Sequence, residues 1–310
     1  GSSRTGRPAS HRLAGVSIST VSKALNGSTD ISATTRTRII ELAKRHGYKI
    51  VKRKPASKLH KGPIIVVIYS DIRSSYFSRL LRLFDSHIKK MDGILIMSPA
   101  EFEPTRIIKL CRFFESTRMV DGIVLIAPYN VFVDISQFNL PIVGLAHPEN
   151  FKTHPFDYIC VDVKVGFDEG IGCLKDHGHK KIAFLSEKLT PHRLQFFKES
   201  MDKYGLPVDP SFVKVSEKRF EEAGFEAMQD ILETQNIPTA VFAAYDDVAV
   251  GAAKAIYAQG MSIPEDISIA GIDNTMCFLN GHNVLSSVNC HIEEQVEIAS
   301  NLLLKKINEE

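Results

Sequence analysis

The chain has few cysteines, and none of them is spaced for a shared task. Five occur among 310 residues, and no Cys-x-x-Cys pair is present. An odd number of scattered cysteines argues against a disulfide framework or a zinc site, and it indicates reduced thiols, as in a cytoplasmic protein. No run of about 18 apolar residues occurs, so we expect no membrane span. The polar N-terminus lacks the apolar segment of a signal peptide.

Catalytic signatures are missing as well. The sequence contains no GxSxG, GxGxxG, HExxH or Walker phosphate loop, and each of these motifs supports a specific chemistry. The eleven histidines are dispersed, and each is expected to be a surface or hydrogen-bonded core residue. We therefore expect no enzyme, no cofactor and no metal.

Acidic residues are scarce at one end of the chain. Residues 1–62 contain 14 Lys or Arg against two acids, a net charge of +12, whereas residues 63–310 contain 24 bases and 34 acids, a net charge of −10. Together these charges give the +2 of the whole chain. A basic segment on an acidic body indicates binding to a phosphate backbone, although a solvated charged face is the simpler alternative.

A short helical pattern lies within this basic segment. Ser17 can cap a helix by accepting a hydrogen bond from a backbone N–H. Three apolar residues follow at helical spacing, namely Val21, Ala24 and Leu25. A further helix is predicted over residues 34–46. The spacing fits a helix-turn-helix and an ordinary helical hairpin equally well, and the charge favours the helix-turn-helix.

The run GVSISTVSKALNG at residues 15–27, followed by Ile31-Ser32, Thr35-Arg36 and Gly47-Tyr48, resembles the headpiece of the lactose-repressor/galactose-repressor (LacI/GalR) family of bacterial transcription regulators. The resemblance implies a set of DNA-contacting residues: Ser17, Ile18, Ser19, Thr20, Ser22, Lys23 and Asn26. Ala56 and Leu59 are similar to the Ala-x-x-Leu of the family's hinge helix, which places its leucine between central base pairs of the operator. A flexible charged linker is the alternative for that segment.

From residue 63 onward, short apolar runs alternate with helical stretches. One set covers residues 64–68, 94–97, 122–126 and 141–145, and a second covers 158–161, 181–185, 240–244 and 267–271. Such runs predict parallel strands that are buried on both faces. The fold class is therefore α/β: a small all-α helix-turn-helix headpiece plus two doubly wound parallel-sheet subdomains, like a periplasmic binding protein. The predicted domains are residues 1–48, a hinge linker at 49–62, and a two-lobed domain at 63–310.

Polar residues at the carboxyl ends of these strands are the candidates for ligand binding. An isolated Asp there is often a helix cap or turn residue, but several together can accept hydrogen bonds from hydroxyl groups. The resemblance implies that Arg193 and Asp273 contact an effector. The expected effector site comprises Asp71, Tyr76, Phe77, His147, Asp162, Arg193, Tyr245 and Asp273. Val163, Tyr245 and His147 depart from the family's pattern, which suits a larger glycoside or a ligand that stacks on aromatic rings.

These observations predict a sequence-specific DNA-binding transcription regulator, of which a repressor is the expected kind. Its partners would be near-palindromic operator DNA, a sugar-like effector between the lobes and a second copy of the chain in a homodimer. Three apolar residues after Phe77 either pack on their own sheet or help form the dimer face: Leu80, Leu83 and Phe84. The alternative is a solute-binding protein of the periplasmic type without DNA function.

Overall fold

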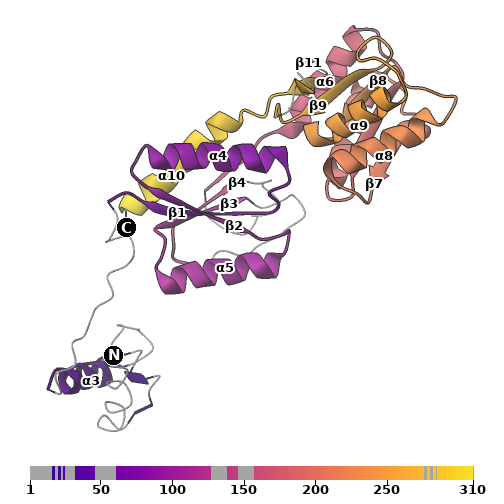
Figure 1. Cartoon of the computed structure of the whole chain (residues 1–310). Coiled ribbons are helices and arrows are strands. Elements are labelled where there is room, and N and C mark those ends of the chain that lie inside the picture. Colours follow the sequence, from indigo (N-terminus) through magenta and orange to yellow (C-terminus); the bar gives the residue numbers. More distant parts are fainter. Residues whose placement is uncertain are drawn as a thin grey trace. The chain divides into compact units, whose positions relative to one another are not determined.

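The computed structural model describes residues 16–17, 20–21, 24, 32–45, 61–126, 138–145, 157–275, 278–279, 282–283 and 285–309 (Figure 1). Its contacts divide the chain into two compact units, Gly1–Leu59 and His60–Glu310. The division falls inside the segment predicted as a linker, and the domain limits of 1–48, 49–62 and 63–310 stay predictions. Each unit is described by itself.

The first unit is built around helix α3 (Ala33–Arg45), which confirms the helix predicted over residues 34–46. Its N-terminus is capped by Ser32, whose hydroxyl accepts a hydrogen bond from the backbone N–H of Thr35 at 3.2 Å. Val21, Ala24 and Ile39 are almost fully buried against one another. The apolar positions predicted at Val21 and Ala24 therefore do form a helical core with α3.

The second unit consists of two lobes, each with a five-stranded parallel sheet. In the first lobe the strand order is β2-β1-β3-β4-β5. The strands are β1 (Ile64–Tyr69), β2 (Ile94–Pro99), β3 (Gly122–Ile126), β4 (Ile142–Leu145) and β5 (Tyr158–Ile159). The helices are α4 (Ser75–Lys89), α5 (Pro104–Thr117) and α10 (Ile292–Glu309). Helices α4 and α5 lie on opposite faces of this sheet (Figure 1), and α10 packs beside α4.

The second lobe repeats this design with strand order β12-β9-β8-β6-β7. Its strands are β6 (Ile182–Glu187), β7 (Val213–Ser216), β8 (Ala240–Ala243), β9 (Ser268–Ile272) and β12 (Ser286–Val288). Its helices are α6 (Val163–Asp176), α7 (Pro191–Lys203), α8 (Phe220–Leu232) and α9 (Asp246–Ala258), with a short 3-10 turn, η3 (Pro210–Phe212). A small antiparallel pair joins β10 (Phe278–Leu279) to β11 (His282–Asn283).

The central strands of each sheet are buried because helices cover both faces of the sheet. Every residue of β1, β3, β4, β6 and β8 is buried. In the second lobe the core is rich in phenylalanine, and the rings of Phe184 and Phe197 stack with centroids 4.7 Å apart. The continuous apolar runs in the sequence therefore correctly predicted doubly buried parallel strands at these five positions. The prediction was wrong for β2 and β5, which are partly exposed because they lie at the edges of the first sheet.

In the part of the chain that the structure describes, two connections cross between the lobes, one from β5 to α6 and one from β12 to α10. These crossings overturn one prediction. Residues 158–161 were expected to belong to the second sheet, but β5 pairs with β4 in the first, with Tyr158 opposite Gly144. An apolar run does not show which sheet it joins, because that choice depends on the path of the chain. Leu80 and Phe84 are fully buried in the first lobe, which confirms packing on their own sheet.

Helices α8 and α9 approach each other at two glycines. A Cβ on Gly224 would lie 1.9 Å from the carbonyl oxygen of Val248, and one on Gly251 would lie 2.0 Å from that of Glu221. Backbone thus contacts backbone across this helix pair, and no side chain fits at either position.

Candidate functional site

A cavity of about 220 Å³ lies between the two lobes, at the carboxyl ends of their strands. The first lobe contributes the start of α4 and the ends of β3 and β4, and the second lobe contributes the end of β6 and the turns after β8 and β9. Open α/β sheets bind ligands at this edge because the loops that follow the strands converge there. The cavity is therefore the candidate ligand site.

Five of the eight predicted effector residues line this cavity: Tyr76, Phe77, Arg193, Tyr245 and Asp273. Asp71 and Asp162 do not line it, and His147 lies outside the described residues. Asp162 instead caps α6, where its carboxylate accepts a hydrogen bond from the backbone N–H of Lys164 at 3.1 Å. This is the local helix-capping role that a strand-end Asp often has.

Arg193 and Asp273 face each other at one wall of the cavity. The Nη2 atom of Arg193 lies 3.9 Å from Oδ1 of Asp273, and its Nη1 donates to the carbonyl oxygen of Ala244. The guanidinium lies over the ring of Tyr245, 5.7 Å from its centroid. Nε of Arg193 is buried and has no acceptor among the described residues. It is therefore an unpaired donor in the wall of the cavity.

Asp273 adopts a left-handed backbone conformation with φ of 106°, which is uncommon for a residue other than glycine. Burial raises the pKa of its carboxyl to about 7, although the positive charge of Arg193 opposes this rise. Cys290 contacts the same carboxylate, and burial also raises the pKa of its thiol to about 12. Asp273 can therefore accept or donate a hydrogen bond near neutral pH.

This shifted pKa predicts a pH-dependent stability. The folded chain holds the Asp273 proton up to about pH 7, whereas the unfolded chain releases it near pH 4, so this carboxyl makes stability fall as pH rises between those values. Asp273→Asn removes the titration. We expect the variant to gain on the order of 2 kcal/mol relative to the parent between pH 5 and pH 8.5. Urea unfolding of the parent and the variant at both pH values measures this gain in stability. A gain no larger than that of Asp202→Asn, at an exposed position, would contradict the prediction.

Tyr76 reaches from the first lobe into the same part of the cavity. Its hydroxyl donates to Oε1 of Gln295 at 2.9 Å, and Gln295 in turn donates to the carbonyl oxygen of Cys290 at 2.6 Å. Burial holds the pKa of Tyr76 far above its ordinary value, and the nearby carboxylate of Asp273 adds to this rise. Tyr76 is therefore a neutral, fixed hydroxyl.

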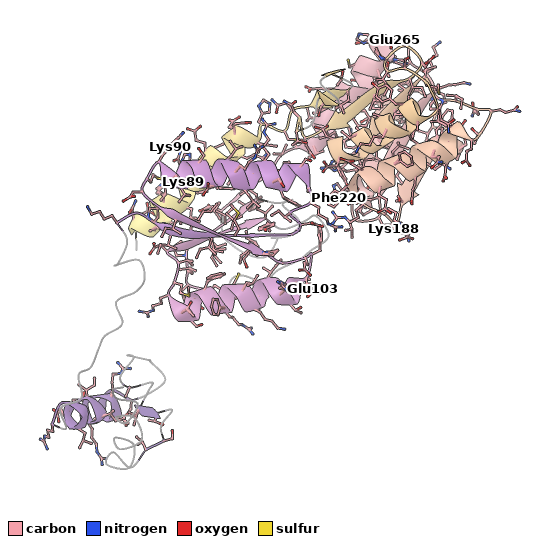
Figure 2. The ribbon with its side chains drawn as sticks, viewed as in Figure 1. Lys89, Lys90, Glu103, Lys188, Phe220 and Glu265 are labelled. Carbon is pink, nitrogen blue, oxygen red and sulfur yellow. The ribbon has the colours of Figure 1, made fainter. Side chains whose placement is uncertain are left out.

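The sequence predictions missed most of the other lining residues, among them four with charged or aromatic side chains: Phe102, Glu187, Arg219 and Phe220. Glu187 ends β6 and carries the same strand-end signal that selected the aspartates, so this signal could have found it. Its carboxylate accepts from Nε of Arg219 at 3.1 Å. Arg219 and Phe220 lie at the start of α8, where no pattern in the sequence marks them. Figure 2 shows Phe220 on the side of the second lobe that faces the first.

In the first unit, the described residues include two of the predicted DNA contacts. The Ser17 hydroxyl accepts from the backbone N–H of Thr20 at 3.1 Å, which confirms the predicted cap, and the two hydroxyls lie 2.8 Å apart. Ser17 is exposed. The other predicted contacts lie outside the described residues: Ile18, Ser19, Ser22, Lys23, Asn26, Ala56 and Leu59.

Within the described parts of the chain, no cluster of three or more His, Cys, Asp or Glu side chains is arranged to hold a metal ion. The helices of these same parts include none that is long and apolar enough to cross a membrane.

The second unit has two doubly wound lobes around a cavity, and the described part of the first unit is helical. This is the architecture of a two-lobed ligand-binding protein with an added helical module. Comparison with known proteins makes the assignment specific. Residues 12–49 match the model described as "Bacterial regulatory proteins, lacI family", and residues 171–310 match that of a "Periplasmic binding protein-like domain". The chain is 30% identical to the HTH-type transcriptional repressor CytR of Escherichia coli K12, over 84% of this chain and 77% of that protein. The chain belongs to the lacI family and is a DNA-binding transcription regulator.

Other relatives agree with this assignment. Catabolite control protein A of Priestia megaterium is 28% identical over 96% of this chain and 91% of its own length. Among solved structures, the lac repressor dimer bound to operator and the anti-inducer ONPF has a TM-score of 0.68 at 20% identity, covering 96% of this chain and 91% of that one. The CelR–cellobiose complex has a TM-score of 0.67 at 21% identity, covering 96% and 92%. At these identities the structural likeness establishes the fold.

Proposed function

We propose that this regulator binds a sugar-like effector in the cavity between its lobes, and that this effector controls its affinity for operator DNA. The observation that carries the proposal is the cavity itself, in which Arg193 and Asp273 of one lobe and Tyr76 and Phe77 of the other line a single space. A ligand that touches both lobes can favour one arrangement of them over another, in proportion to its different affinities for the two.

The charges in the cavity favour a neutral effector. An acidic side chain lies beside each of its two guanidinium groups, Asp273 at 3.9 Å from Arg193 and Glu187 at 3.1 Å from Arg219. Aromatic and aliphatic side chains cover much of the remaining wall, including Phe77, Ile126 and Leu145. Rings of this kind bind the apolar faces of sugars and bases, while buried polar groups accept and donate at their edges. The cellobiose complex of the CelR regulator is one instance of such a ligand on this fold.

A thermal-shift screen tests the effector proposal. The full chain is heated with neutral saccharides and glycosides, sugar phosphates, and nucleobases with their nucleosides. We expect a neutral, hydroxyl-bearing compound to raise the melting temperature, because ligand at a hundred times its Kd adds about 2.7 kcal/mol of stability. Calorimetry then gives the affinity of any compound that does so. A screen in which only sugar phosphates stabilise the chain would contradict a neutral effector.

For DNA, we propose that Ile18, Ser19 and Lys23 face base edges while Ser17 and Thr20 contact phosphates. This follows the usual docking of a recognition helix, whose N-terminal residues enter the major groove. The exposed Ser17 hydroxyl beside Thr20 supports the phosphate contact. Lys can donate to guanine O6 and N7, and an Ile side chain can contact a thymine methyl group.

The Lys23→Ala variant shows whether Lys23 contacts a base or only a phosphate. We expect a loss of about 1–3 kcal/mol on an operator selected from random duplexes, and a smaller loss on a randomised duplex, because a base contact is made only at the right sequence. Fluorescence anisotropy at a fixed salt concentration measures both affinities. Equal losses on the two duplexes would show that Lys23 contacts phosphate alone.

We also propose that the chain acts as a homodimer on near-palindromic operators, with Ala56 and Leu59 in a hinge that binds the operator centre. Each chain has one headpiece, and two-fold symmetry of the protein then matches two half-sites in the DNA. Light scattering at micromolar concentration, with and without operator, tests the dimer, and a monomer in both conditions would exclude it. Because its target is chromosomal DNA, we propose that the protein works in the bacterial cytoplasm.

A further inference from the structure

One side chain that lines the cavity, Arg219, contacts charged and aromatic groups from both lobes. Arg219 precedes α8 in the second lobe, and its Nη1 donates to Oδ2 of Asp71 in the first lobe at 3.1 Å. Its Nε donates to both carboxylate oxygens of Glu187, at 3.3 and 3.1 Å. One guanidinium therefore joins a carboxylate of each lobe.

Aromatic rings enclose the same guanidinium. Its central carbon lies 4.4 Å from the ring centroid of Phe102 in the first lobe and 4.3 Å from that of Phe220 in the second. Both phenylalanines have positive φ, 62° and 57°. This conformation is strained for a bulky residue, and it persists only where the surrounding structure imposes it. Two strained backbone positions thus place rings against a single arginine.

The charges around Arg219 also favour these contacts. Arg219 lies at the N-terminus of a helix, where the macrodipole disfavours a cation, so its position depends on the two carboxylates. The side chains of Arg219, Asp71 and Glu187 are only 20%, 14% and 2% exposed, which limits screening by solvent. Burial by itself would raise the pKa of Asp71, but hydrogen bonds from Arg73 and the charges of Arg73 and Arg219 lower it below its ordinary value.

We propose that Arg219 is an interlobe latch: with no effector bound, its contacts to Asp71 and Phe102 hold the two lobes together across the cavity. It is a positioning residue, and it sets how easily the lobes separate to admit a ligand. A second interlobe hydrogen bond, from the Ser75 backbone N–H to Oδ2 of Asp247 at 3.0 Å, supports the same arrangement. The regulatory meaning of the latch rests on the proposed effector site, whereas its mechanical role does not.

Single-molecule energy transfer on the ligand-free full chain tests the latch. Labels are placed at exposed positions on α5 and α8, Lys109 and Gln229, through an encoded non-natural amino acid, so that the native cysteines stay in place. We expect Arg219→Gln and Asp71→Asn each to lower the ratio of close to separated lobes at least fivefold. The double variant should lower it no further than Arg219→Gln alone, because that change already removes the contact to Asp71.

The structure offers a matched control in Asp168. Its carboxylate is also held by two cations, Lys164 at 2.5 Å and Lys203 at 2.8 Å, and is 20% exposed, but all three residues belong to the second lobe. Asp168→Asn should therefore lower the melting temperature without changing the distance distribution. If it changes that distribution as much as Asp71→Asn does, the effect is general destabilisation and the latch is excluded.

If the lobes of every variant stay close together, the same variants are measured again in the Ser75→Ala background. This change removes the Ser75 side-chain contact to Asp247 and makes separation easier to detect. Unchanged distributions for Arg219→Gln in both backgrounds overturn the proposal. Because no ligand is used, a failed effector screen leaves this result unaffected, and an unchanged distribution leaves the effector site standing.

Discussion

Arg193→Ala is expected to weaken effector binding at least tenfold and to leave operator affinity without effector unchanged. The Arg193 guanidinium is fixed by the carbonyl oxygen of Ala244 and by the ring of Tyr245, and its buried Nε has no acceptor among the described residues. A ligand group that accepts from the guanidinium would be left unsatisfied in the variant, as would Asp273. Losing such a buried partner costs about 1–3 kcal/mol, and tenfold corresponds to about 1.4 kcal/mol.

Calorimetric titration with the compound found by thermal shift measures this loss. Lys198→Ala is the matched control, because Lys198 lies on the exposed face of the same helix, α7. Arg193→Lys should restore only part of the affinity, since an ammonium group lacks the planar fork of donors. If Arg193→Ala binds the compound as tightly as the parent while operator release is intact, the effector lies elsewhere.

Gly224→Ala is expected to destabilise the second lobe by about 3 kcal/mol or more, at the upper end of what overpacking usually costs. The new Cβ would meet three backbone atoms: the Val248 oxygen at 1.9 Å, the Val248 carbonyl carbon at 2.8 Å and the Ala252 nitrogen at 3.0 Å. Backbone cannot rotate away as a side chain can, so α8 and α9 must move apart.

Urea unfolding at one pH measures this loss through the shift in midpoint. Glu226→Ala, on the exposed face of α8, is the control and should change stability by no more than about 0.5 kcal/mol. Alanine normally favours a helix over glycine, so a Gly224→Ala variant as stable as the parent would show that the two helices are not in backbone contact.

We expected polar residues at the carboxyl ends of strands to bind the ligand. This expectation predicted the position of the cavity better than the direction of individual side chains. Tyr245 and Asp273 follow strands of the second lobe and line the cavity, as expected. Asp162 follows a strand as well, but its carboxylate turns back to cap α6. The carboxylate of Asp71 accepts hydrogen bonds from the guanidinium groups of Arg73 and Arg219. The expectation identifies where a residue lies, whereas local hydrogen-bond donors decide where its side chain points.

By itself, the sequence determined what depends on neighbouring residues: the buried central strands, the Ser17 cap, the helix over residues 34–46 and the basic headpiece. These follow from periodicity, capping chemistry and charge, which act over a few residues. Only the tertiary structure decided that β5 joins the first sheet, that α10 returns to pack beside α4, and that Arg219 meets a carboxylate 148 residues away. Such pairings depend on how the chain crosses between lobes, and no local pattern encodes that path.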